Sequence, residues 1–139
     1  MNTWNKDWRR FCEEIVRDFN EGLDDAALSQ KYGGSKVHWS GTVKELDLDS
    51  QSLPSVSITM DVKTKYISKG RKFICDSVTL FIDDALKVSW FGADVGEFVE
   101  FEAFIYEKNG PFNGVKVSIF PGDDSAILLL GLHHAKRVA

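Results

Sequence analysis

The hydrophobic period of this sequence changes abruptly after Gly33-Gly34. Before that point apolar residues recur every three or four positions, as they do on one face of a helix; after it, apolar and polar residues alternate, as they do in half-buried strands. The chain has 139 residues, the length of one ordinary domain. We therefore predict that residues 1–139 form a single domain with helices first and strands after them.

Residues 3–21 form the clearest predicted helix. Thr3 is predicted as its N-cap and Gly22 as the C′ residue that ends it. Its charged residues lie opposite a wide, aromatic apolar stripe. The stripe consists of Trp4, Trp8, Phe11, Cys12, Ile15, Val16, Phe19 and Leu23. We expect this stripe to dock on its own domain, and the alternative is that it forms a surface for a protein partner or a homodimer.

A second, shorter helix is predicted over residues 25–32. Asp24 has the side chain of an N-cap, and Gly33-Gly34 ends the segment. At helical spacing Leu28 and Tyr32 face inward. The helical N-terminal segment therefore spans residues 3–33.

Alternation of apolar and polar residues predicts a series of short strands. Their ranges are 37–43, 56–62, 73–82, 86–90, 98–106 and 115–119. Residues 64–72 are polar and contain Gly70, which predicts a loop or a flared hairpin, and turn signals over 108–114 predict that strand 115–119 pairs with strand 98–106. The run 126–132 is apolar on all sides, and periodicity leaves it open between a buried strand and a short helix.

Two of these runs resemble strands of an OB-fold. Val37-His38-Trp39-Ser40-Gly41-Thr42-Val43 resembles the first strand, which coils around the barrel at a glycine, and Gly96-Glu97-Phe98-Val99-Glu100-Phe101-Glu102-Ala103 resembles the fourth. Residues 115–119 fit the fifth strand. The resemblance covers about residues 35–120. The order of elements is similar to that of bacterial "tRNA anticodon-like" OB domains, in which a helix precedes the first strand.

The resemblance implies a mainly β (α+β) fold: a small five-stranded antiparallel β-barrel over 35–120, preceded by an amphipathic N-terminal helix and a short second helix. Residues 121–139 are then a C-terminal extension that packs on the barrel. Many OB-folds carry a helix between the third and fourth strands, whereas only residues 92–95 occupy that gap here, too few for one. Another small barrel or a β-sandwich is the alternative.

Charge and composition exclude several functional classes. The net charge is −4, which disfavours tight, nonspecific nucleic-acid binding. No apolar run approaches the 18 or more residues of a membrane span, so we expect no membrane association. Cys12 and Cys75 are too few for a disulfide framework. Free thiols fit a reducing compartment, and the polar N-terminus lacks the apolar region of a signal peptide. Together these two features predict a cytoplasmic protein.

The charge is distributed unevenly. Segment 61–72 is basic, whereas segment 83–107 is acidic. Five cations and two aromatic residues lie within eleven positions: Lys63, Lys65, Tyr66, Lys69, Arg71, Lys72 and Phe73. Single-strand binders combine cations for the phosphates with rings for the bases. If the OB resemblance holds, this stretch lies near the usual ligand face, and the alternative is an ordinary solvated loop.

We find no constellation for catalysis, metal or cofactor binding. His133 and His134 are adjacent, so in a regular strand they point to opposite faces and make no ligand pair. Cys12 lies on the apolar stripe, where burial is expected, and Glu100 and Glu102 are expected to be solvated.

The sequence thus predicts a non-enzymatic OB-like binding module without a cofactor, with single-stranded nucleic acid as its ligand. The alternative is a protein-interaction or scaffold domain that uses the N-terminal helix or the acidic strand 98–106.

Overall fold

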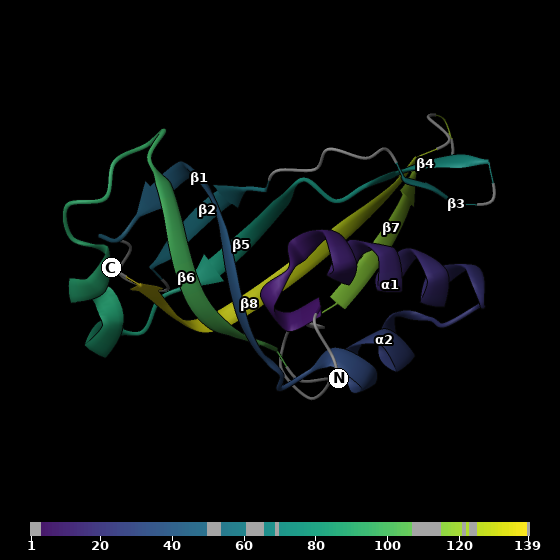
Figure 1. Ribbon diagram of the computed structural model, residues 1–139, viewed down its shortest axis with the longest axis horizontal. Coiled ribbons are helices and arrows are strands. Elements are labelled where there is room, and N and C mark those ends of the chain that lie inside the picture. Colours follow the sequence, from purple (N-terminus) through teal and green to yellow (C-terminus); the bar gives the residue numbers. More distant parts are fainter. Residues whose placement is uncertain are drawn as a thin grey trace.

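The computed structural model describes residues 4–49, 54–60, 66–68, 70–106, 115–120, 122 and 125–138. Helices lead the chain and strands follow, as Figure 1 shows. The helical elements are the 3-10 helix η1 (Trp4–Lys6), α1 (Trp8–Asn20), α2 (Asp25–Tyr32) and the 3-10 helix η2 (Asp84–Trp90). The strands are β1 (Lys36–Asp47), β2 (Ser55–Thr59), β3 (Tyr66–Ser68), β4 (Arg71–Ile74), β5 (Ser77–Phe81), β6 (Phe98–Ile105), β7 (Val115–Phe120) and β8 (Ser125–Val138).

Five strands close into a ring. β1 pairs with β2 on one side and with β6 on the other, and β2 pairs with β5. β8 closes the ring because it runs parallel to β5 and antiparallel to β6. This five-stranded barrel behind an N-terminal helix confirms the predicted mainly β, OB-like fold class.

The prediction that residues 115–119 form the fifth barrel strand and pair with strand 98–106 is wrong. β7 pairs only with β8 among the described strands, and β6 meets β8 instead, through Ile105 opposite Leu132. The apolar run 126–132 is the reason, because it belongs to the 14-residue strand β8. β8 is long enough to pair in two sheets, with β5 and β6 in the barrel and with β4 and β7 beyond it.

The first half of β8 lies in a second sheet, which extends from the barrel in the order β3, β4, β8, β7 (Figure 1). β4 runs parallel to β8, with Phe73 opposite Ala126. α1 and α2 cover one face of this sheet: Ser29 of α2 bonds to the backbone of Val115, and Phe19 of α1 packs on Phe73. The opposite face of the sheet is therefore the outer one.

β1 passes from one barrel partner to the other next to Gly41. Residues 36–42 pair with β6, and residues 42–47 pair with β2, with an irregular register between Val43 and Glu45. A Cβ atom at Gly41 would lie 2.5 Å from Ile58 Cγ2 and 2.7 Å from the Thr59 carbonyl oxygen. Only glycine lets β2 approach β1 this closely.

The ends of α1 are set by local hydrogen bonds. Asp7 rather than Thr3 is its N-cap, because the Asp7 carboxylate accepts from the Arg9 N–H at 3.0 Å; Thr3 lies outside the described residues. Gly22, at φ +94°, is the C′ residue as predicted. The N–H groups of Gly22 and Leu23 donate to the carbonyls of Phe19 and Asp18 and satisfy the last turn.

The aromatic stripe of the N-terminal helix is buried against its own domain, as expected. Neighbouring ring centroids lie 4.8–5.5 Å apart among five large side chains. They are Trp4, Trp8, Phe11, Tyr32 and Trp39. Burying each side chain of this size contributes about 1.5–3 kcal/mol. Leu28 and Tyr32 of α2 face inward as predicted, at 0% and 1% exposure.

Residues 84–90 form the 3-10 helix η2, so the predicted strand 86–90 is wrong. Only Trp90 is fully buried there, and its indole N–H donates to the Ala135 carbonyl at 3.1 Å. Val88 is 68% exposed. A helical turn therefore does lie between β5 and β6, in residues predicted as a strand and before the gap at residues 92–95. No described helix has the length and apolarity needed to cross a membrane.

Candidate functional site

The described residues of the basic stretch lie in a hairpin, as one of the two sequence interpretations predicted. β3 and β4 pair antiparallel around Gly70, with Tyr66 opposite Phe73 and Ser68 opposite Arg71. Gly70 has a φ of +78°, a backbone conformation that favours glycine in the turn. Lys63, Lys65 and Lys69 lie outside the described residues.

The hairpin separates its rings from its cations. Tyr66 is 8% exposed and donates through its hydroxyl to the Arg9 carbonyl at 3.3 Å, and Phe73 is 3% exposed. Lys72 is exposed and Arg71 half-buried, and within the described residues neither forms an ion pair. The hairpin thus offers unneutralised cations to solvent, while its two rings belong to the core.

The outer face of β8 connects this hairpin to the barrel. Alternation along β8 buries Leu128, Leu130 and Leu132 and turns the residues between them outward. Lys72 lies opposite Ser125, and Lys116 of β7 lies opposite Leu129. Because directly opposed residues share a face, both lysines flank the outer face of β8.

A stack of three rings occupies the same outer face where β8 enters the barrel. The rings of Tyr106 and His133 lie 4.2 Å apart at 22°, and those of His133 and His134 lie 4.1 Å apart at 30°. Phe81 meets Tyr106 edge-on at 5.7 Å, and Phe104 meets His134 edge-on at 6.2 Å. We call Tyr106, His133 and His134 the ring stack.

The ring stack corrects the prediction that the adjacent histidines diverge. His134 has a φ of +51°, and the β6–β8 register is irregular between Glu102 and Phe104. This break in the strand period turns the His134 ring back beside that of His133. Near-parallel rings do not converge on one ion, and the described part of the chain holds no cluster of three or more metal-ligating side chains.

Two neighbours hold the stack in place. The carboxylate of Asp83 is hydrogen-bonded to Nδ1 of His134. At Gly131 a Cβ atom would lie 3.2 Å from Cδ2 of Tyr106, so the tyrosine ring rests over the glycine. Burial, and secondarily the charge of Asp83, raises the pKa of Tyr106, so its hydroxyl remains protonated and the ring neutral.

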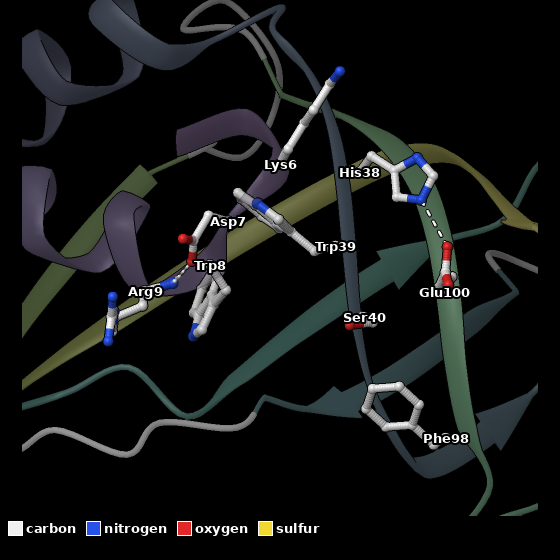
Figure 2. A pocket seen from close by; sticks show the side chains of 9 residues that line it. All are labelled: Lys6, Asp7, Trp8, Arg9, His38, Trp39, Ser40, Phe98 and Glu100. Carbon is white, nitrogen blue, oxygen red and sulfur yellow. Dashed lines mark hydrogen bonds and ion pairs between the residues drawn. The ribbon is translucent and has the colours of Figure 1, made fainter. Parts of the chain in front are cut away.

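A cavity of about 500 Å³ lies between the start of α1 and strands β1 and β6. Its lining comprises Lys6, Asp7, Trp8, Arg9, His38, Trp39, Ser40, Phe98 and Glu100. Figure 2 shows Lys6 and Arg9 at the helix side and His38 bonded to Glu100 across β1 and β6, at 3.0 Å. Cations and carboxylates are thus mixed in this cavity.

The acidic strand β6 is less acidic than its sequence indicates. Glu100 pairs with His38, and Glu102 pairs with Lys36 at 3.1 Å. The hydrogen bond from Lys36 holds the pKa of Glu102 below its usual value. A second cavity of about 730 Å³ shares Phe98 and Glu100 with the first and reaches Lys136. Glu100 and Glu102 of β6 therefore each have a partner on the neighbouring strand β1.

Comparisons with known proteins concern the fold. No protein-family model matches the sequence. No curated protein matches it either. Two crystal structures of the S. cerevisiae mitochondrial single-stranded DNA-binding protein Rim1 are similar, at 14% and 13% identity with TM-scores of 0.38 and 0.40, covering 76% of this chain and 95% of theirs. Schizosaccharomyces pombe Pot1pC bound to ssDNA is similar at 14% identity, a TM-score of 0.34 and 80% and 84% coverage. At these values no property of those proteins is transferred.

Proposed function

We propose that this chain is a non-enzymatic module that binds single-stranded nucleic acid, with the basic stretch 63–73 as its phosphate-binding surface. The observation that carries the proposal is the hairpin β3–β4, which exposes Lys72 and half exposes Arg71 without a carboxylate partner in the described structure. Lys63, Lys65 and Lys69 extend this charge in the sequence. Unpaired cations at the edge of the second sheet suit a phosphate chain.

The net charge of −4 does not contradict this proposal, since phosphate binding depends on local charge. The carboxylates of β6 that would repel a nucleic acid are paired with Lys36 and His38. We further propose a subtype similar to the tRNA anticodon-like OB domains, because α1 and α2 precede β1. A cytoplasmic location fits the two free thiols, both buried.

For the alternative of a protein-interaction domain, only one of the two predicted surfaces is accessible to a partner. The aromatic stripe of the N-terminal helix is buried, with Trp4 and Trp8 each 7% exposed. The outward residues of β6 remain the surface that a protein partner would use, with Phe98 65% exposed at its start.

The test is fluorescence anisotropy of a labelled single-stranded DNA of mixed sequence, titrated with the full chain at several salt concentrations. A chain of about 20 nucleotides exceeds the ~4–16 that one OB domain covers. The Lys69→Ala/Arg71→Ala/Lys72→Ala variant is expected to bind more weakly. It should also lower the slope of log affinity against log salt by about 2, since each phosphate contact to a single strand contributes about 0.7.

The matched control carries the same change in charge at exposed positions outside the hairpin: Arg10→Ala/Arg17→Ala/Lys44→Ala. Its salt slope should stay near that of the unmodified chain. No binding even at low salt would exclude the nucleic-acid function and direct the search to protein partners of β6. An equal loss in both triple variants would exclude the hairpin as the site.

A further inference from the structure

We propose that the ring stack of Tyr106, His133 and His134 is the surface on which the bases of the bound single strand stack. This assignment rests on the proposed function and adds a base-binding site to its phosphate-binding surface. The stack lies on the outer face of β6 and β8. That is a different place from the second and third barrel strands that OB-folds commonly use.

The face of β2 and β5, the second and third strands of this barrel, is unsuited to bases. Its outward residues are mostly hydroxyl side chains, with Ser57 opposite Thr79 and Thr59 opposite Ser77. Phe81 is the exception, and it belongs to the edge of the ring stack, 5.7 Å from Tyr106. The outward face of β2 and β5 therefore offers Phe81 as its aromatic ring, and that ring lies beside Tyr106.

Three independent features build the stack. Gly131 leaves room for the Tyr106 ring. His134 adopts a left-handed backbone conformation, which is unfavourable for a non-glycine residue and tends to occur at functional sites. Asp83, which lies between β5 and η2, is hydrogen-bonded to the imidazole of His134 and orients it. A cluster that served only cross-strand packing would need none of these, because branched aliphatic side chains pack well on a pleated surface.

The chemistry of the stack matches nucleobases. Each ring is flat and carries a polar group at its edge, and the side chain of His134 is 52% exposed. Burial keeps Tyr106 neutral by raising its pKa. Bases stack on the π-faces of such rings regardless of sequence, and here an end ring rather than the middle ring, His133, can present a face.

The stack is continuous with the proposed phosphate-binding surface. Ser125, opposite Lys72, and His133 lie on the same face of β8, about 26 Å apart at the usual strand rise. Between them that face carries Ile127, Leu129 and Gly131, with Lys116 opposite Leu129. A single strand laid along β8 would meet cations first and rings second, with no carboxylate on β8 between them.

The experiment compares two labelled chains of equal length, one with bases and one abasic, by anisotropy at fixed salt. The ratio of their affinities measures the contribution of the bases. Tyr106→Leu keeps an apolar cover over Gly131 but removes the flat ring, and His133→Ala removes the middle of the stack. Each is expected to lower the ratio about tenfold, as loss of one stacking contact does, while the salt slope stays unchanged. Phe91→Ala is the control, since it removes a 60% exposed ring outside the stack.

The outcomes separate the two proposals. If the base-bearing chain binds with the expected salt slope and neither stack variant changes the ratio, the ring stack is excluded while the proposed function stands. If neither chain binds at low salt, the proposed function fails and the stack assignment with it. Thermal unfolding of both variants verifies that a changed ratio does not reflect loss of the fold, and agreement between the two positions supports the assignment.

Discussion

Gly41 is the residue at which the barrel is most sensitive to a single atom. The space that a Cβ would fill is already occupied by the side chain of Ile58 and the backbone of Thr59. The backbone oxygen cannot move without disturbing the β1–β2 ladder, so an added methyl group must displace a strand rather than a flexible side chain.

Gly41→Ala should therefore lower the free energy of unfolding by about 1–3 kcal/mol, the usual cost of overpacking a core. Urea unfolding followed by tryptophan fluorescence measures it. Gly122→Ala is the matched control, because nothing lies within 4 Å of its added Cβ, and it should change stability by no more than about 0.5 kcal/mol. A Gly41→Ala protein as stable as the control would show that β2 shifts freely.

The residues of the basic stretch show how far a site can be read from sequence. Their identity predicted cations beside rings, and the hairpin was predicted as one alternative. Alternation places Tyr66 and Phe73 opposite one another on the inner face, where α1 covers both. The ring stack had no such signal, because the backbone of His134 departs from strand geometry and residue type does not specify that departure.

At the scale of the element, two side chains of α2 bond to β7: the Asp25 carboxylate accepts from the Val117 N–H at 2.9 Å, and the buried Ser29 bonds to Val115. Ser29 is 0% exposed; its hydroxyl donates to the Val115 carbonyl at 3.0 Å and accepts from the Val115 N–H at 3.1 Å. The Ser29 hydroxyl thus satisfies both the N–H and the carbonyl of Val115, the first residue of β7.

Ser29→Ala should cost about 2–3 kcal/mol of stability, since it leaves a buried donor and acceptor without partners. Ser77→Ala, at an exposed position on β5, is the control and should be nearly neutral. Hydrogen exchange of the Val115 amide should accelerate in the first variant alone. Unchanged protection of that amide would mean that β8 rather than α2 holds β7.

Which elements could be predicted depends on how their apolar residues are spaced. α1, α2 and the first strand have one dominant period each, and all three were predicted. Leu86 and Trp90 are four apart, so they fit a helical turn as well as an alternating strand, and η2 was mistaken for a strand. β8 is apolar on both faces where it crosses two sheets, and this removed the period that would have identified it.

For the molecule as a whole, the interface between the helices and the sheets contains side chains that must be neutral in the folded state. A hydrogen bond to Cys75, then burial, raises the pKa of Cys12. Burial, then the bond to the Asp18 carboxylate, raises the pKa of Tyr32. Burial, then the neighbouring thiols, raises the pKa of Tyr66.

These shifts make the whole fold sensitive to alkaline pH. The unfolded chain releases its protons near the ordinary pKa values, 9.0 for the thiol and 10.0 for the phenols, whereas the folded chain keeps them. The unfolded state then binds fewer protons, so the free energy of unfolding falls as pH rises above about 9, by up to about 1.4 kcal/mol per pH unit for each group. Urea unfolding at pH 8, 9, 10 and 11 measures this slope. Tyr66→Phe removes one of the three groups and should flatten the slope only above pH 10. Stability that stays constant from pH 8 to 11 would show that these side chains ionise without lowering the free energy of unfolding. An equal slope in Tyr66→Phe would show the same for Tyr66 alone.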